Sequence, residues 1–172
     1  MGKRSDFEKI PRSCYDTPAK GVAPLLPFLM PETLFIEPNA GKGDLVRHLQ
    51  AAGHICTAAY DIEPRAPRIY RADALTLEVR TPGLIIGNPP WERHLLHPMI
   101  ENFMRQRVTW LLFDADWMHT RQAAGLIRHC VSIVSIGRLI WMPGTANTGK
   151  DNCAWYCFHA DHTEGPRFHG RT

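Results

Sequence analysis

TLFIEPNAGKG, residues 33–43, joins a short apolar run to a turn that contains two glycines. Residues 33–37 predict a buried strand, because the run is brief, apolar and bounded by turn-forming residues. The next segment, residues 44–52, predicts a helix with one apolar face, and Gly53 is suited to its C-cap. A buried strand that passes through a glycine loop into a helix indicates an α/β fold.

The same alternation continues on both sides of this segment. Further strands are predicted at residues 55–60, 68–71, 83–87 and 109–113, and further helices at residues 95–105 and 120–129. Thr17 is expected to cap an earlier helix that Pro18 begins and Pro31 ends. Two final strands, residues 131–140 and 152–159, flank a polar loop at residues 143–149. This order predicts a single-domain α/β protein with a mostly parallel, doubly wound sheet and an antiparallel edge strand.

The amino-acid composition limits which classes of protein the chain can belong to. Of the 172 residues, 44% are hydrophobic and 22% are charged, which favours one folded domain over disorder. The net charge of +3 is compatible with a polyanionic partner but does not require one. No apolar run is long enough to span a membrane, and residues 1–9 lack the apolar segment of a signal peptide. With five scattered cysteines, these features predict a cytoplasmic protein with reduced thiols and no membrane partner.

Residues with chemical potential cluster after the predicted strands. In a doubly wound sheet, ligands bind beyond the carboxyl ends of the strands, which selects residues 37–43, Asp61, Asp73 and residues 88–91. The glycine loop lacks the Gly-Lys-Ser/Thr of a phosphate-binding loop, and Glu37 would repel a pyrophosphate. A carboxylate there suits the cationic ammonium end of a methionine moiety.

Two of these acids suit a nucleoside. Asp61, at the end of the second strand, can accept hydrogen bonds from both ribose hydroxyls. Asp73, after the third strand, could accept one from an adenine amino group. Asp61 alone is equally compatible with a helix N-cap or a solvated turn, and Asp73 alone is weak evidence because exposed aspartates are common in loops.

IIGNPPW, residues 85–91, places an amide, two prolines and an aromatic ring directly after a buried strand. The prolines remove two donors and fix the backbone, which makes the carbonyl groups of Asn88 and Pro89 rigid acceptors. Such acceptors suit an amino group that must be held while its nitrogen attacks. Trp91 offers a face on which a planar base could stack, worth roughly 1–3 kcal/mol.

The run from Tyr15 to Trp91 resembles the class I S-adenosylmethionine-dependent amino-methyltransferases, above all the DNA adenine-N6 group. The resemblance implies a Rossmann-like methyltransferase fold over residues 15–172, with residues 1–14 as a flexible arm and no separate target-recognition domain. It implies the cofactor S-adenosylmethionine, the product S-adenosylhomocysteine and no metal. The implied cofactor residues are Tyr15, Thr17, Pro18, Glu37, Pro38, Asn39, Ala40, Gly41, Gly43, Asp61, Ile62, Asp73, Ala74 and Asn88, and the implied catalytic residues are Asn88, Pro89, Pro90 and Trp91.

The resemblance implies direct methyl transfer to an exocyclic amino nitrogen, with adenine N6 in DNA as the favoured target. Alternatives are the same chemistry on RNA or on a protein glutamine, and a non-catalytic nucleic-acid-binding module on this fold. Candidate phosphate contacts are Arg93, His94, Arg105, Arg107 and Lys150, although a solvated basic face explains them equally well. Because no recognition domain is expected, a partner subunit or a homodimer could supply specificity.

Two further patterns receive structural explanations. Cys153 and Cys157 lie four apart on a predicted strand, where their shared face favours a place in the core over a metal site. Asp114 and Asp116 follow the strand at residues 109–113, where they are expected to line the pocket or cap the next helix.

Overall fold

The structure, a computed structural model, describes residues 15–141 and 149–171. The expected arm at residues 1–14 and most of the expected loop at residues 143–149 lie outside the described residues. The strands are β1 (Leu34–Glu37), β2 (Ile55–Asp61), β3 (Tyr70–Arg71), β4 (Leu84–Gly87), β5 (Thr109–Asp114), β6 (Cys130–Arg138), β7 (Asn152–Phe158) and β8 (Arg167–His169). The α-helices are α1 (Ala19–Val22), α2 (Asp44–Ala51), α3 (Arg93–Gln106) and α4 (Ala124–Ile127), and the 3-10 helices are η2 (Ala23–Phe28), η3 (Ala115–His119) and η4 (Arg121–Ala123).

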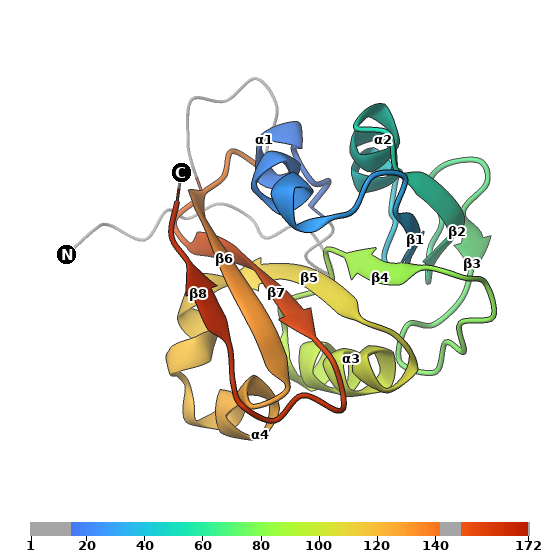
Figure 1. The fold of residues 1–172 in the computed structure, drawn as a ribbon. Helices are drawn as coiled ribbons and strands as arrows, with labels where there is room; N and C mark the ends of the chain where they lie inside the picture. Colours follow the sequence, from blue (N-terminus) through green and yellow to red (C-terminus); the bar gives the residue numbers. More distant parts are fainter. Residues whose placement is uncertain (1–14, 142–148, 172) are drawn as a thin grey trace.

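Within the described residues, one eight-stranded sheet has the order β3-β2-β1-β4-β5-β7-β6-β8 (Figure 1). The pairs among β1 to β5 are parallel. β7 inserts antiparallel between β5 and β6, and β8 pairs parallel with β6. The predicted mostly parallel sheet with an antiparallel strand near one edge is confirmed.

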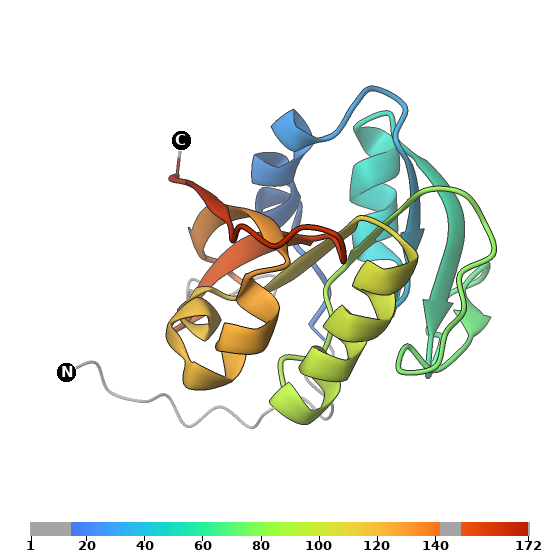
Figure 2. The ribbon, with the colours of Figure 1, turned by 60° about the horizontal axis from the view of Figure 1, so that its bottom comes forward.

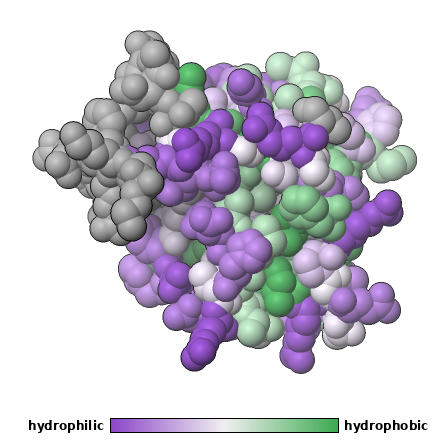
Figure 3. Space-filling view, turned by 90° about the vertical axis from the view of Figure 1, so that its left-hand side faces the viewer, coloured by the Kyte–Doolittle hydropathy of each residue, from purple (hydrophilic) through white to green (hydrophobic). Residues whose placement is uncertain are grey.

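β8 is the one strand of the described residues that sequence analysis missed. Its three residues, Arg167–His169, are too few to show an alternating pattern. Phe168 is 59% exposed, and Phe28 of η2 packs edge-on against His169 with ring centroids 4.7 Å apart. Figure 3, viewed from the side of β8 and α4, shows hydrophobic residues interspersed with hydrophilic ones on this face.

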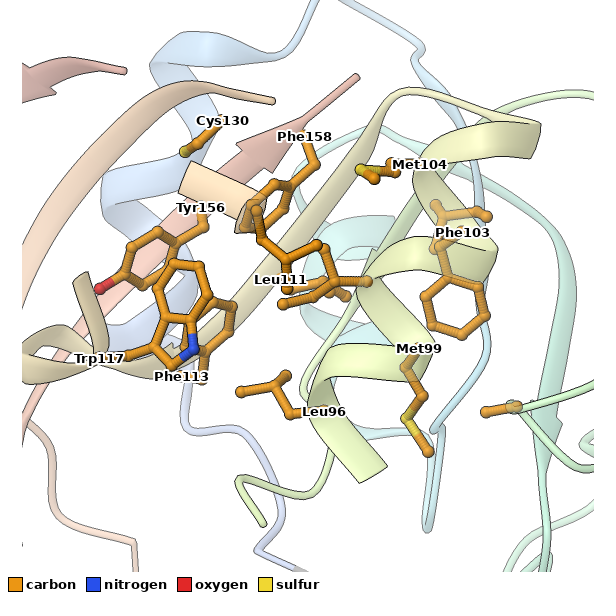
Figure 4. Close-up of a cluster of buried hydrophobic side chains, with 14 of the residues drawn as sticks. Leu96, Met99, Phe103, Met104, Leu111, Phe113, Trp117, Cys130, Tyr156 and Phe158 are labelled. Atoms are coloured by element: carbon orange, nitrogen blue, oxygen red, sulfur yellow. The ribbon is translucent and has the colours of Figure 1, made fainter. Parts of the chain in front are cut away.

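Helices cover both faces of the sheet (Figures 1 and 2). α1, η2 and α2 pack over one face, around a core that includes Phe35, Leu49 and Trp155. α3 and α4 pack over the other face, where Phe103, Phe113 and other apolar side chains fill the space beneath α3 (Figure 4). The sheet is therefore buried between two layers of helices.

The prediction of one helix between Thr17 and Pro31 is wrong in part. The chain forms four residues of α-helix and then a 3-10 helix, because Pro24 and Pro27 cannot donate α-helical hydrogen bonds. Thr17 is not the cap. Pro18 occupies that position without a side-chain hydrogen bond, and Thr17 is buried, 4% exposed.

Other boundaries shift more modestly. The helix expected at residues 120–129 is divided into η4 and the short α4. α3 begins two residues before its predicted start, and β3 keeps only the last two residues of its predicted span. α2 matches its prediction closely, with Gly53 in the left-handed conformation just beyond its last turn.

Candidate active site

A pocket of about 450 Å³ opens where β1, β2 and β4 end. Its walls come from the segment before α1, the glycine loop, the residues after β2 and β3, and the start of α3. This is the sheet edge at which doubly wound folds bind ligands. The topology therefore brings together five segments that are separated in the sequence.

Asp61 holds the glycine loop against the end of β2. Its Oδ2 accepts a hydrogen bond from the Gly41 amide at 2.7 Å, and its Oδ1 accepts one from the Glu63 amide at 2.8 Å. The Ala40 amide also donates to the Tyr60 carbonyl at 2.8 Å. A carboxylate has about four lone-pair sites, so Asp61 keeps capacity to accept further hydrogen bonds from a ligand.

Gly41 gives the loop its close approach to the pocket. Its φ is +53°, and a Cβ built there would lie 2.5 Å from the Arg65 guanidinium. The left-handed backbone therefore favours glycine, and a side chain here would require the Arg65 guanidinium to move. Gly43, at φ +79°, forms the N-cap of α2.

Glu37 is a buried carboxylic acid with an unsatisfied oxygen. It is 2% exposed, it lines the pocket, and its Oε2 has no hydrogen-bond partner among the described residues. Burial, with smaller contributions from Asp61 and Asp44, raises the pKa of Glu37 from 4.5 to about 8, although the Val46 amide opposes the shift. An orphaned acid in a pocket is suited to a cationic or donor group of a ligand.

Asn39 presents a second unsatisfied oxygen. Its Oδ1 is buried and has no hydrogen-bond partner in the part of the chain that the structure describes, while its Nδ2 lies 4.0 Å from the Met99 sulfur. Together with Glu37, it gives the glycine-loop side of the pocket two acceptors that await donors.

Asn88, at the end of β4, is oriented by the chain before α1. Its Nδ2 donates to the Tyr15 carbonyl at 3.1 Å. Asn88 and Pro90 line the pocket, and Pro89 is buried beside them. The amide orientation leaves Oδ1 as the acceptor of this side chain that can face a substrate.

Trp91 lies beside the pocket, not among its lining residues. Its ring meets that of Trp141 edge-on, with centroids 5.7 Å apart, and Trp141 in turn contacts Tyr15 at 5.9 Å. Trp91 also packs against both core clusters. Sequence analysis did not single out Trp141, because an isolated tryptophan after a strand carries no spacing signal.

Most of the residues implied for the cofactor meet at this pocket. Those that line it are Tyr15, Thr17, Glu37, Asn39, Ala40, Gly41, Asp61, Ile62, Asp73, Ala74 and Asn88. Pro18, Pro38 and Gly43 lie outside the lining and shape the adjoining turns. The Asp73 Oδ1 accepts a hydrogen bond from the Leu75 amide at 2.9 Å, which holds the turn after β3.

Asp16 and Arg65 are pocket residues that sequence analysis missed. Arg65 Nη2 lies 3.2 Å from Asp16 Oδ1, and Lys42 Nζ lies 3.2 Å from Asp16 Oδ2. The Arg65 amide also donates to the Gly41 carbonyl at 3.0 Å. No sequence pattern links residues separated by 49 positions, so only the fold could reveal this contact.

The candidate phosphate contacts separate into two groups. Arg93 and His94 begin α3 close to the pocket, and His94 lines it. Arg105 and Arg107 lie at the opposite end of that helix, about 18 Å away at 1.5 Å per residue, and Arg105 pairs with Glu101 at 3.1 Å. Lys150 is exposed before β7. The structure therefore does not gather these side chains into one patch.

The remaining polar patterns are structural. Cys153 and Cys157 are both buried in the core on the α1 side of the sheet, as predicted. Asp114 caps η3 by accepting from the Asp116 amide at 2.9 Å, as predicted, and its burial raises its pKa. Among the residues that the structure describes, no three metal-ligating side chains group together, and no helix could cross a bilayer.

Solved methyltransferase structures share this fold. A proposed RNA methyltransferase from Pyrococcus horikoshii matches with a TM-score of 0.59 and 14% identity, over 84% of this chain and 85% of that chain. A dimethyladenosine transferase from Plasmodium falciparum matches with a TM-score of 0.56 and 12% identity, over 84% and 62%. A TehB-like S-adenosylmethionine-dependent methyltransferase from Corynebacterium glutamicum matches with a TM-score of 0.54 and 14% identity, over 82% and 86%.

The chain therefore has the Rossmann-like fold of S-adenosylmethionine-dependent methyltransferases. No protein-family model matches its sequence, and no curated protein does so either.

Proposed function

We propose that this chain is a methyltransferase that uses S-adenosylmethionine to methylate an exocyclic amino nitrogen, with adenine N6 in nucleic acid as the target. The observation that carries the proposal is the pocket itself. It joins the unsatisfied acid Glu37, the glycine loop at Gly41 and the oriented amide of Asn88 at one strand edge.

The residues present fit the proposed cofactor. Glu37 and Asn39 would offer buried acceptors to the ammonium end, Asp61 would offer lone pairs to the ribose, and Asp73, in the pocket lining, would accept from an adenine amino group. Gly41 lines the pocket without a side chain, so its backbone would face the ligand directly. When bound, the cofactor would supply a methyl group activated by a sulfonium sulfur.

The proposed role of the Asn88 corner is to hold and polarise the acceptor nitrogen. Asn88 Oδ1 and the Pro89 carbonyl would accept the two amino hydrogens, which draws the nitrogen lone pair away from the ring. The bound cofactor would supply the methyl carbon to this nitrogen and would keep the electron pair of its carbon–sulfur bond, and one amino proton would pass to solvent. Catalysis would rest on positioning and on acceptors fixed in advance.

Nucleic acid is the favoured substrate class. The motif order resembles DNA adenine-N6 enzymes, while the names of two solved structures of the same fold refer to RNA and to dimethyladenosine. A base in a duplex would have to be flipped out of its stack to reach the pocket. Trp91 lies beside the pocket, and after a rotation of its side chain it would stack on the base. We favour DNA over RNA, and we expect a homodimer or a partner subunit to supply sequence recognition in the cytoplasm.

A methyl-transfer assay with labelled cofactor tests the proposal directly. The intact chain is incubated separately with DNA, RNA and protein, and the product is digested to identify the methylated group. N6-methyladenine in the DNA arm supports the full proposal, and the same product in RNA alone revises the substrate. Methylated glutamine would overturn the nucleic-acid target, and no binding of cofactor in calorimetry would favour the non-catalytic module.

A further inference from the structure

Asp16 lies between two basic side chains that come from different segments of the pocket wall. Its Oδ1 lies 3.2 Å from Arg65 Nη2, and its Oδ2 lies 3.2 Å from Lys42 Nζ. Lys42 belongs to the glycine loop, and Arg65 belongs to the segment that follows β2. The two carboxylate oxygens of Asp16 therefore tie the segment before α1 to both of these loops.

Arg65 is itself anchored to the glycine loop. Its amide donates to the Gly41 carbonyl at 3.0 Å, and its guanidinium lies over Gly41, close to where a Cβ would be. The side chains of Arg65 and Asp16 are 33% and 30% exposed, so solvent screens this pair only in part. An isolated surface ion pair contributes little, whereas a network with a well-placed guanidinium holds its geometry. Asp16 thus rests on a partner whose position is fixed by the backbone.

The position of Asp16 determines where the Tyr15 carbonyl points. That carbonyl belongs to the peptide bond between Tyr15 and Asp16, and a peptide unit is planar from one Cα to the next. The same carbonyl accepts a hydrogen bond from Asn88 Nδ2 at 3.1 Å. A continuous path of contacts therefore runs from the glycine loop, through Arg65 and Asp16, to the side-chain amide of Asn88.

We propose that Asp16 is a positioning residue for methyl transfer: its ion pairs with Arg65 and Lys42 hold the Tyr15 carbonyl, which keeps Asn88 Oδ1 directed at the substrate amino group. This inference rests on the proposed function. If the carbonyl moves, the amide of Asn88 loses its partner and rotates, and its oxygen no longer faces the reacting nitrogen. Asp16 acts on the rate through Asn88, without contact with the reacting atoms.

Single-turnover methyl transfer by the full chain tests the effect on rate. The cofactor is kept at saturation, so that changes in its affinity do not enter, and the nucleic acid is the one that the labelled assay identifies. We expect Asp16→Asn to lower the rate about tenfold or more, because small displacements of a positioned group are costly. Asp16→Glu should lower it less, since a carboxylate remains for Arg65. Glu101→Gln, which breaks the exposed pair with Arg105, should leave the rate unchanged.

The Asn88→Ala background separates positioning from a general structural effect. If Asp16 acts through Asn88, Asp16→Asn should cause little further loss in a chain that already lacks the amide, because changes that act through one group are not additive. An unchanged rate in Asp16→Asn, or the same fractional loss in both backgrounds, would overturn the inference and leave the proposed function standing. If the unmodified chain methylates no substrate, the proposed function itself fails.

A measurement without ligand tests the positioning directly. In nitrogen-15 NMR spectra of the full chain, the side-chain NH2 signals of Asn88 are assigned by their loss in Asn88→Ala. We expect these signals to shift in Asp16→Asn and to stay in place in Glu101→Gln. Unshifted signals in Asp16→Asn would show that the Tyr15 carbonyl keeps its place without the ion pairs, which would refute the inference whatever the methyl-transfer rates are.

Discussion

The side-chain amide of Asn88 donates to the backbone carbonyl of Tyr15 at 3.1 Å, across 73 residues of sequence. This contact fixes which end of the amide faces the pocket, because the nitrogen is committed to the carbonyl. The segment before α1 therefore sets the direction of the acceptor oxygen at the end of β4. Orientation by a backbone atom also means that no side-chain change at Tyr15 can remove the acceptor of this bond.

Changes at Asn88 should separate chemistry from cofactor binding. We expect Asn88→Ala to lower kcat by about 10² to 10³-fold, since one fixed polar partner of the transition state is lost. Asn88→Asp should be less damaging, because it keeps an oxygen acceptor but loses the donor to Tyr15. Calorimetry should show nearly unchanged cofactor affinity for both variants, and a fully active Asn88→Ala would refute the assigned role.

Glu37→Gln should stabilise the fold while weakening cofactor binding. The folded state raises the pKa of Glu37 from 4.5 to about 8, so the unmodified protein loses stability as pH rises between these values. Removal of the ionisable group should therefore increase the free energy of unfolding at pH 7, by at most about 3 kcal/mol. Urea unfolding at pH 4 should show little difference between the two proteins, and an equal difference at both pH values would contradict this account.

Gly41→Ala and Gly53→Ala form a matched pair. Both glycines have positive φ, at +53° and +91°, so each alanine should cost about 1 kcal/mol of stability. Only at Gly41 would the new Cβ meet Arg65, whereas the space around Gly53 is open. Cofactor affinity should fall in Gly41→Ala alone, and a comparable loss in Gly53→Ala would mean that global destabilisation is responsible.

Trp155→Phe tests the link between α1 and the sheet. The Trp155 Nε1 donates to the Gly21 carbonyl at 2.8 Å, and both residues are buried. Loss of the donor leaves a buried carbonyl unsatisfied, which should reduce the free energy of unfolding by about 1–3 kcal/mol. Denaturant unfolding should show this loss, while Phe168→Leu on the exposed face of β8 should change stability by less than about 0.5 kcal/mol.

Arg93→Ala and Arg105→Ala compare the two ends of α3. Arg93 begins the helix at the pocket edge, and Arg105 lies near its far end in an ion pair with Glu101. We expect a base held in the pocket to bring its flanking phosphates near Arg93. Arg93→Ala should therefore weaken oligonucleotide binding and reduce the slope of log affinity against log salt concentration by about one. Fluorescence anisotropy over a range of salt concentrations measures both effects, and a larger loss in Arg105→Ala would move the nucleic-acid surface elsewhere.

Local sequence patterns predicted much of the fold, because the spacing of apolar residues along the strands and helices matches the faces that are buried. β1, the glycine loop and α2 were predicted almost to the residue, since three consecutive signals agree there. Residues 23–28 form a 3-10 helix where an α-helix was predicted, because Pro24 and Pro27 lack the amide donors of an α-helix. The apolar side chains of this 3-10 helix still pack in the core beside β6. β8 escaped prediction because its stability comes from pairing with β6, not from its own three residues.

The residues of the candidate site also divide into those that local patterns predict and those that they do not. Residues that follow strands could be predicted, because topology alone brings strand ends together. Asp16, Arg65 and Trp141 could not, since their contacts depend on the paths of loops. Trp91 illustrates a third case: its position after β4 was correct, yet its ring packs on Trp141 beside the pocket.

The antiparallel insertion of β7 has a consequence for how this scaffold can be extended. β6 ends, and β7 begins, at the same side of the sheet as the Asn88 corner, and the Gly149 amide donates to the Leu139 carbonyl at 2.7 Å. This hydrogen bond holds the two described ends of the β6–β7 connection next to each other. A graft placed between them would incur a closure entropy that grows only slowly with its length, so new recognition sequences could be installed there without altering a single strand.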